Sequence, residues 1–173
     1  MKAMVVYESM FGNTAQIAKA IAIGLGESVD QVVAMEVSQA PADPGPEVGM
    51  IVAGGPTHAF SMSREGTRAD AITRGAPEGE RAFGLREWVD GLPSGRHDER
   101  LATFDTKIAK MRHLPGSAAK SAAKVARSHG YKAAAPAESF YVEDVDGPLL
   151  DGETDRATAW GRRLATSMKA AMR

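Results

Sequence analysis

Apolar residues occur along the chain in short runs that alternate with longer segments of helical periodicity. Residues 3–7 form a short apolar run with two valines and a tyrosine, flanked by polar residues, as expected of a strand buried on both faces. Residues 13–25 then carry Ile17, Ile21 and Leu25 at four-residue intervals, the spacing of one helix face. A predicted strand therefore leads directly into a helix that can cover a sheet.

The same alternation continues to the end of the chain. Further strands are predicted at residues 32–37, 50–54, 101–105 and 131–142, the last with a break near Pro136. Helices are predicted at residues 117–129, and from about residue 152 onwards with Ala157, Trp160, Leu164 and Met168 on one side. Because parallel strands need crossover connections, which helices usually supply, this order predicts an α/β doubly wound sandwich.

The segment 61–92 is longer than one simple crossover. It contains two helical pieces, at 64–74 and 84–89, separated by a break rich in Gly, Pro and Glu at 75–79. Because the segment is polar, we expect an excursion over one edge of the sheet and not a second core. A length of 173 residues suits one domain, so residues 1–173 are predicted to form a single domain.

Composition narrows the class of protein. Hydrophobic residues make up 43% and charged residues 25%, values typical of globular chains and not of disordered or fibrous ones. The absence of cysteine excludes disulfides and thiolate metal sites, and fits a reducing cytoplasm. Residues 1–7 lack the features of a signal peptide, and no run approaches the roughly 20 apolar residues of a membrane span. We therefore expect a cytoplasmic protein without a membrane partner.

Charge is unevenly distributed although the net charge is only -1, which provides no global attraction to nucleic acid. Between residues 107 and 132 no acidic residue interrupts a basic tract. The tract consists of Lys107, Lys110, Arg112, Lys120, Lys124, Arg127 and Lys132. Two interpretations stay open: a solvated helix face, or a surface that attracts an anionic cofactor or substrate.

Ligands of doubly wound sheets bind outside the carboxyl ends of the strands, which directs attention to the loop at 8–14. Ser9, Asn13 and Thr14 can donate hydrogen bonds, and Gly12 allows a tight turn. The amides that open the following helix attract a phosphate through their unpaired N–H groups and partial positive charge. Alternatively, Ser9 or Asn13 only caps the helix, a role compatible with phosphate binding.

Other phosphate-binding motifs are missing. The chain has no G-x-x-x-x-G-K-[ST] and no G-x-G-x-x-G in the first turn, which disfavours a P-loop nucleotidase and a standard dinucleotide site. Gly54 and Gly55 stand where a phosphoacceptor domain would end its third strand with aspartate. A monophosphate site made of hydroxyls and amides remains.

The stretch Tyr7-Glu8-Ser9-Met10-Phe11-Gly12-Asn13-Thr14 resembles the phosphate loop of the flavodoxin family and its FMN-reductase relatives. The resemblance extends through residues 54–58 (Gly-Gly-Pro-Thr-His), and bacterial proteins with a flavodoxin domain share the runs at 104–107 and 147–149. It implies a flavodoxin-like α/β doubly wound sandwich with a five-stranded parallel sheet in the order 2-1-3-4-5.

The resemblance also implies FMN as cofactor, with its phosphate at residues 9–14 and its ring between 55–60 and 104–107. The implied cofactor-binding residues are Ser9, Met10, Phe11, Gly12, Asn13, Thr14, Pro56, Thr57, His58, Ala59, Phe60, Phe104, Asp105, Thr106 and Lys107. No catalytic side chain and no metal ligand is assigned.

Several of these residues have a purely structural alternative. Phe60 or His58 could stack on the ring, but Phe60 could equally pack against the core or the excursion, and His58 could have a surface or capping role. Phe104 could close the core of the sheet, and Asp105 could cap the turn that follows it.

The segment that follows the predicted strand at 101–105 differs from the corresponding segment of flavodoxin electron carriers. Those carriers typically flank the flavin ring with aromatic side chains and surround it with acidic residues. Here Phe104 is followed by Lys107, Lys110 and Arg112, without tyrosine or tryptophan. A cation within ~4 to 6 Å of flavin N1 would favour the anionic reduced form and ease addition of the second electron. We therefore expect an FMN-dependent oxidoreductase that acts on a quinone-like or other small acceptor, with NAD(P)H or a redox partner protein as donor. Alternatives are a flavodoxin-type electron carrier and a flavin-free binding module.

Overall fold

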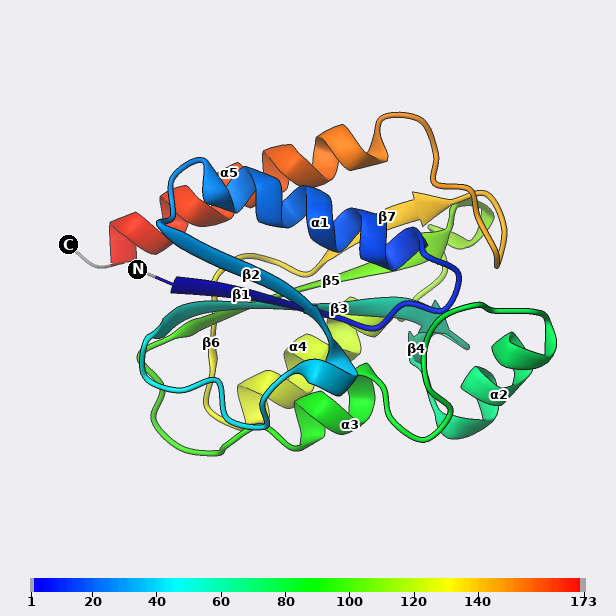
Figure 1. The fold of residues 1–173 in the computed structure, drawn as a ribbon, viewed down its shortest axis with the longest axis horizontal. Coiled ribbons are helices and arrows are strands. Elements are labelled where there is room, and N and C mark those ends of the chain that lie inside the picture. Colours follow the sequence, from blue (N-terminus) through cyan, green and yellow to red (C-terminus); the bar gives the residue numbers. More distant parts are fainter. Residues whose placement is uncertain (1, 172–173) are drawn as a thin grey trace.

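The computed structural model describes residues 2–171 and shows a parallel β-sheet with helices on both faces (Figure 1). The strands are β1 (Lys2–Tyr7), β2 (Gln31–Glu36), β3 (Val48–His58), β4 (Ser61–Met62), β5 (Arg100–Ile108), β6 (Lys132–Ala133) and β7 (Glu138–Val142). The α-helices are α1 (Asn13–Gly26), α2 (Glu65–Thr73), α3 (Leu85–Asp90), α4 (Ala118–Ser128) and α5 (Glu153–Ala171). None of the helices within residues 2–171 is long and apolar enough to cross a membrane.

The strand order β2-β1-β3-β5-β6 confirms the predicted topology. The two-residue β4 pairs antiparallel with the end of β3, so β5 is the fourth parallel strand. The fifth strand is split as predicted, because β6 and β7 both pair with β5 and are separated by residues 134–137, around Pro136. Because β1 and β3 are paired in parallel, their carboxyl ends lie side by side.

Alternating side chains of the strands build one apolar core on each face of the sheet. Ala3 and Val5 of β1 pack with α1 and α5 on one face, where Trp160 and Leu164 are buried as predicted. The neighbouring residues of β1 point to the opposite face, which α3 and α4 cover (Figure 1). A sheet covered on both faces leaves its carboxyl edge as the open side.

Helices α1 and α5 lie in unusually close contact. A Cβ atom added at Gly24 would lie 2.0 Å from the carbonyl oxygen of Thr158, and one added at Gly161 would lie 2.3 Å from that of Ile21. The two glycines therefore let the helix backbones touch, which fixes how α1 is placed over the sheet.

The segment 61–92 combines an excursion with a piece of the core. Helix α2 lies beside the carboxyl ends of the strands, whereas α3 packs below the sheet near α4 (Figure 1). Leu85, Trp88 and Val89 are at most 2% exposed and belong to the core on the face that α3 and α4 cover. Helix α3 is therefore part of the core, contrary to the expectation of a peripheral excursion. Because α3 has only six residues, its apolar face is too short for the hydrophobic pattern to predict that it is buried.

Strands β3 and β5 run further than their apolar stretches predicted. Residues 55–58 and 106–107, which lie beyond the predicted strands 50–54 and 101–105, belong to β3 and β5, and the two strands remain paired with each other as far as Pro56 and Thr106. Polar residues at the carboxyl ends of the strands hid this continuation from the hydrophobic pattern. The corrected strands carry these residues straight to the open edge of the sheet.

Candidate functional site

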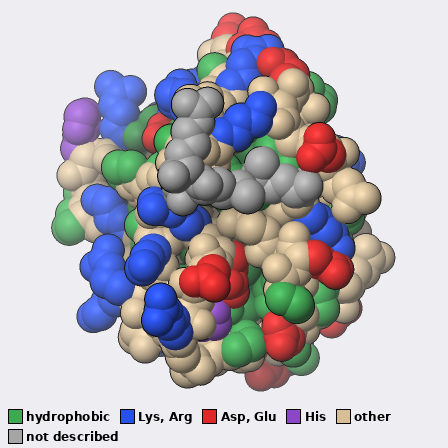
Figure 2. Space-filling view, turned by 90° about the vertical axis from the view of Figure 1, so that its left-hand side faces the viewer, with side chains coloured by type: hydrophobic (Ala, Val, Ile, Leu, Met, Phe, Trp, Pro, Cys, Tyr) green, Lys and Arg blue, Asp and Glu red, His purple; other side chains and the backbone are tan. Residues whose placement is uncertain are grey.

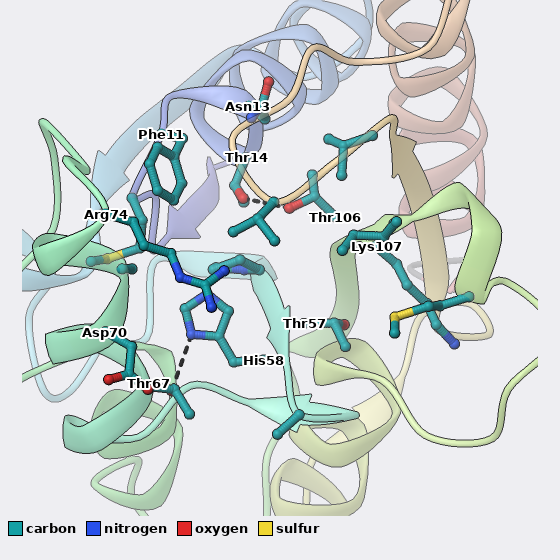
Figure 3. Close-up of a pocket in the computed structure, with 18 of the residues that line it drawn as sticks. Phe11, Asn13, Thr14, Thr57, His58, Thr67, Asp70, Arg74, Thr106 and Lys107 are labelled. Atoms are coloured by element: carbon teal, nitrogen blue, oxygen red, sulfur yellow. Dashed lines mark hydrogen bonds between the residues drawn. The ribbon is translucent and has the colours of Figure 1, made fainter.

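A cavity of about 320 Å³ opens at the carboxyl edge of the sheet (Figure 3). Its walls come from the loop after β1, the ends of β3, β5 and β7, and helix α2. Eleven of the fifteen predicted cofactor-binding residues line it: Met10, Phe11, Asn13, Thr14, Pro56, Thr57, His58, Ala59, Phe60, Thr106 and Lys107. Its volume is at the lower end of the range of about 300 to 1,000 Å³ that is usual for small-molecule sites.

The loop before α1 is folded around the hydroxyl of Ser9. Its Oγ accepts hydrogen bonds from the amides of Gly12 (3.1 Å) and Ala15 (3.3 Å). Gly12 has φ 92°, a left-handed conformation that a residue with a Cβ adopts only at a cost. Ser9 is thus buried and shapes the loop without lining the cavity, which matches the capping alternative.

The start of α1 keeps unused donors. Within residues 2–171 the backbone amides of Asn13 and Thr14 find no hydrogen-bond acceptor. Such amides at the first turn of a helix, reinforced by the helix dipole, are suited to an anion. Both residues also line the cavity, so the part of the cavity beside the start of α1 can bind an anionic group.

The side chains of Thr14 and Asn13 are engaged in contacts between loops. The hydroxyl oxygens of Thr14 and Thr106 lie 2.7 Å apart and join α1 to β5. Asn13 donates from Nδ2 to the carbonyl oxygen of Asp146 at 3.1 Å, which ties down the loop after β7. These contacts hold three walls of the cavity in fixed relative positions (Figure 3).

The turn between β3 and β4 presents Phe60 at the mouth of the cavity. Ala59 and Phe60 have φ values of 47° and 64°, so two consecutive residues with side chains are left-handed. The pairing of His58 with Ser61 shows that they form a two-residue hairpin loop, where Asn-Gly is usually preferred. The Phe60 ring is 45% exposed and does not pack in a core.

His58 lines the cavity as a neutral, oriented side chain. Burial, and secondarily the charge of Arg68, lowers the pKa of His58 below its ordinary value. Its Nδ1 lies 3.1 Å from the hydroxyl oxygen of Thr67 on α2, so the ring is fixed against that helix (Figure 3). His58 therefore does not have the surface role given above as an alternative, because its ring forms part of the cavity wall.

Phe104 and Asp105 do not reach the cavity. Phe104 is fully buried in the core between the sheet and helices α1 and α5, where its ring packs edge to face with Phe140 and Trp160. Asp105 points to the other face of β5 and accepts a hydrogen bond from the amide of Ala119 at 2.9 Å, near the start of α4. Burial raises the pKa of the Asp105 carboxyl. For Phe104 the core alternative is confirmed, whereas Asp105 does not cap the turn after it, because β5 continues to Ile108 and the carboxyl instead binds at the start of α4.

Lys107 lines the cavity, and its ammonium group donates hydrogen bonds to a neighbouring loop. Its Nζ donates to the carbonyl oxygens of Leu114 (2.9 Å) and Gly116 (3.0 Å), and the side chain is 6% exposed. The ammonium therefore holds the loop at 109–116 against the wall and adds a fixed positive charge there.

Eight wall residues were not predicted from the sequence. They are Thr67, Asp70, Ala71, Arg74, Ile108, Met111, Val142 and Val145. Half of them lie on or directly after α2, which was recognised as a helix but could not be positioned from its sequence. Of the others, Ile108 and Val142 are the last residues of β5 and β7, and Met111 and Val145 lie three residues further on. The predicted fourth strand ended at residue 105, before the true end of β5, and so did not point to Ile108.

A buried network of charges fastens α2 to the sheet. Arg68 on α2 is fully buried and donates to both carboxylate oxygens of Glu87, at 2.8 and 3.0 Å. Its guanidinium also lies 3.8 Å from Glu8 at the end of β1, whose carboxylate accepts hydrogen bonds from Ser63 and the amide of Leu85. Burial raises the pKa of Glu8 despite these contacts. The network makes α2 a rigid wall of the cavity.

A carboxylate lies close to the loop that was predicted to bind phosphate. The amide of Glu78 donates to the carbonyl oxygen of Met10 at 3.1 Å. The Glu78 carboxylate would be 3.9 Å from a Cβ atom at Gly12. This acid was not anticipated, since nothing in the sequence links residue 78 to residue 12.

The basic tract divides between the two ends of the molecule. Helix α4 starts beside Asp105 at the carboxyl edge and ends at the amino edge, where β6 pairs with the beginning of β5. Lys107 therefore lies at the cavity, whereas Arg127 and Lys132 lie at the far end. Figure 2 views that far end and shows Lys and Arg side chains gathered along one flank. A solvated surface accounts for that part of the tract.

The strand order and the helices on both faces of the sheet define a flavodoxin-like α/β fold, as the sequence resemblance predicted. A flavodoxin from the domain Archaea has a TM-score of 0.67 and 21% identity, over 98% of this chain and 99% of that chain. Flavodoxin 2 from Bacillus cereus has a TM-score of 0.68 and 18% identity, over 96% and 99%. The Flv1 flavodiiron core from Synechocystis sp. PCC6803 has a TM-score of 0.66 and 15% identity, over 99% of this chain and 36% of its own.

The sequence itself matches no protein-family model and no curated protein. At the identities of the solved structures, the likeness establishes the flavodoxin-like fold of this chain. What the cavity binds has to be argued from its own residues.

Proposed function

We propose that this protein binds FMN noncovalently and is an FMN-dependent oxidoreductase of quinone-like or other small acceptors. The observation that carries the proposal is the start of α1, whose unpaired amides at Asn13 and Thr14 open directly onto a largely apolar cavity. An anion-binding helix start beside an apolar slot suits a ligand with a phosphate at one end and a flat ring at the other. The fold likeness to flavodoxins supports the same cofactor.

In this proposal the chain divides its residues between the two ends of FMN. The unpaired amides of Asn13 and Thr14 would hold the phosphate, in a loop shaped by Ser9 and Gly12. Residues 56–60, Thr106 and Lys107 would hold the ring, with Phe60 covering its exposed side. Phe104 and Asp105 would act only indirectly, through the packing of β5 and α4.

When bound, FMN supplies two-electron transfer, by which NAD(P)H, a proton and a quinone would become NAD(P)⁺ and a hydroquinone. The protein would position the ring and tune its potential. The fixed ammonium of Lys107 would favour negative charge on a reduced ligand in this wall. Neutral His58 would add no second positive charge beside it.

The proposed activity is tested with FMN-loaded protein. We expect NADH or NADPH oxidation that depends on added 1,4-benzoquinone, and a reductive titration in which both electrons enter in one step. Lack of any turnover with either donor, together with two well-separated one-electron steps, would contradict the enzyme assignment.

A second candidate function is electron transfer between proteins, without a substrate of its own. It is supported by four exposed apolar side chains at or near the cavity: Phe60 (45% exposed), Met111 (40%), Leu114 (46%) and Val145 (38%). Large apolar side chains grouped at a ligand site suit contact with another protein. Two separated one-electron steps in the titration would favour this candidate, and failure to retain FMN would favour a flavin-free binding module.

A further inference from the structure

The wall contributed by α2 contains a charged group without a partner. Arg74 lies directly after α2 and lines the cavity, which is otherwise mostly apolar. Within residues 2–171 no carboxylate lies at ion-pair distance from its guanidinium. Figure 3 shows the Arg74 side chain reaching into the cavity beside His58.

The lack of an ion pair is informative because α2 offers one. Asp70 precedes Arg74 by four residues, a spacing at which opposite charges on a helix usually meet. The two groups do not pair, and Figure 3 shows the Asp70 carboxylate directed away from the centre of the cavity. The guanidinium is thus presented to whatever the cavity holds.

The backbone at Arg74 is held in place by the rest of α2, and its side chain is exposed at the wall of the cavity. Arg68 on the same helix is fully buried and bound to Glu87 through two hydrogen bonds, and Thr67 contacts His58. A guanidinium on a rigid support can bind a carboxylate, sulfonate or phosphate through two parallel hydrogen bonds. The helix start of α1 already provides donors for the phosphate of FMN, so the proposed cofactor does not require Arg74.

We infer that Arg74 is a specificity-determining residue that binds the anionic group of the second redox substrate, so that the site prefers acidic quinones to neutral ones. This inference rests on the proposed function for the redox character of the ligand. The anion site itself depends only on the residues of the α2 wall.

The test compares two probes of equal ring size by calorimetric titration: anthraquinone-2-sulfonate and neutral 2-(hydroxymethyl)anthraquinone. We expect Arg74→Ala to weaken binding of the sulfonate about tenfold, as typical of a lost hydrogen bond to a charged group, and to change binding of the neutral probe less than about twofold. Arg74→Lys should restore only part of the loss, because an ammonium lacks the fork of a guanidinium.

The matched control is Arg64→Ala, which removes the same charge from an exposed position before α2 that does not line the cavity. It should leave binding of both probes unchanged. An equal loss for both probes in Arg74→Ala, or no loss for either, would overturn the inference. So would a lower affinity for FMN with unchanged affinity for riboflavin, because Arg74 would then hold the cofactor's own phosphate.

The titrations are run on flavin-free and FMN-treated protein. If the protein takes up no FMN but still binds the sulfonate through Arg74, the proposed function fails and the anion site stands. If FMN binds and the sulfonate preference is absent, only the assignment of Arg74 fails.

Discussion

Single residues at the carboxyl edge decide how this site is charged. Glu8 and Glu78 are both acids near the loop before α1, yet they lie in opposite environments. Glu8 is 1% exposed and held in a network with Arg68, whereas Glu78 is exposed beside Gly12. Their effects on stability and on ligand binding can therefore be separated by experiment.

Glu8 makes stability depend on pH. Burial raises the pKa of Glu8 above its ordinary value of 4.5, so the folded state holds this proton more tightly than the unfolded state. The stabilising contribution of the group is complete below pH 4.5 and is lost as the pH rises through the raised pKa. Glu8→Gln removes this titration. As the pH rises through the raised pKa of Glu8, the free energy of unfolding of the variant should therefore increase relative to that of the wild type, by up to about 1.4 kcal/mol per pH unit.

Urea denaturation at several pH values from 4 to 8 measures this difference. Glu80→Gln, an exposed glutamate in the segment that connects α2 and α3, serves as control and should run parallel to the wild type. A constant difference between Glu8→Gln and the wild type across the range would show that the carboxyl does not titrate as described.

Glu78 should oppose the binding of a phosphate. Its carboxylate lies close to Gly12, and like charges about 4 Å apart repel by about 1 kcal/mol even in water. We expect Glu78→Gln to lower the Kd for FMN about threefold and to leave the Kd for riboflavin unchanged, with Glu80→Gln as control. Fluorescence titration with both flavins measures the effect, which should fade at high salt. An unchanged Kd for FMN at low salt would place the phosphate elsewhere.

At the scale of elements, two places in the fold are held in unusual geometry. The β3–β4 turn forces Ala59 into a left-handed conformation, and the α1–α5 contact leaves no space for a Cβ at Gly161. The first supports the mouth of the cavity, and the second places the helix that forms its upper end.

Relief of the turn should stabilise the protein. A left-handed conformation costs a residue with a side chain roughly 1–2 kcal/mol, part of which glycine returns as backbone entropy. We expect Ala59→Gly to raise the free energy of unfolding by about 0.5–1 kcal/mol, whereas Ala69→Gly within α2 should lower it by about 1 kcal/mol. Chemical denaturation measures both. Equal losses in the two variants would mean that the turn at residue 59 is not strained.

The α1–α5 contact predicts the opposite sign for an added methyl group. Gly161→Ala should lower the free energy of unfolding by about 1–3 kcal/mol, because the new Cβ would meet the carbonyl of Ile21 and separate the helices. Gly26→Ala is the control, since nothing lies within 4 Å of its Cβ position and alanine favours a helix. A harmless Gly161→Ala, judged by thermal unfolding, would contradict the close packing of α1 against α5.

Elements were predictable where one face was apolar and continuous. The helix over 13–25 and the strands around Val5 and Val52 follow directly from hydrophobic periodicity. The ends of β3 and β5 did not, because Thr57 and Lys107 are polar, yet contacts with the first residue of α4 and with the loop before it bury Lys107 and partly bury Thr57. Such contacts join residues far apart in the sequence, and no local pattern encodes them.

At the scale of the whole molecule, the cavity is assembled from segments that only the fold brings together. The sequence identified the loop at 8–14 and the turn at 56–60, because ligands of doubly wound sheets bind where these segments meet. It did not identify Arg74 or Val145. Their positions depend on the buried network around Arg68 and on the bond from Asn13 to Asp146, both of which form only in the folded chain.

The central claim, that the start of α1 receives the phosphate of a flavin, is tested most directly by titrating the flavin-free protein with FMN and with riboflavin. Flavin fluorescence and absorption are followed in parallel. The account predicts tight binding of FMN with a perturbed spectrum, and binding of riboflavin that is at least about tenfold weaker, since riboflavin lacks the phosphate. Equal affinity for the two flavins, or no spectral change with either, would contradict it.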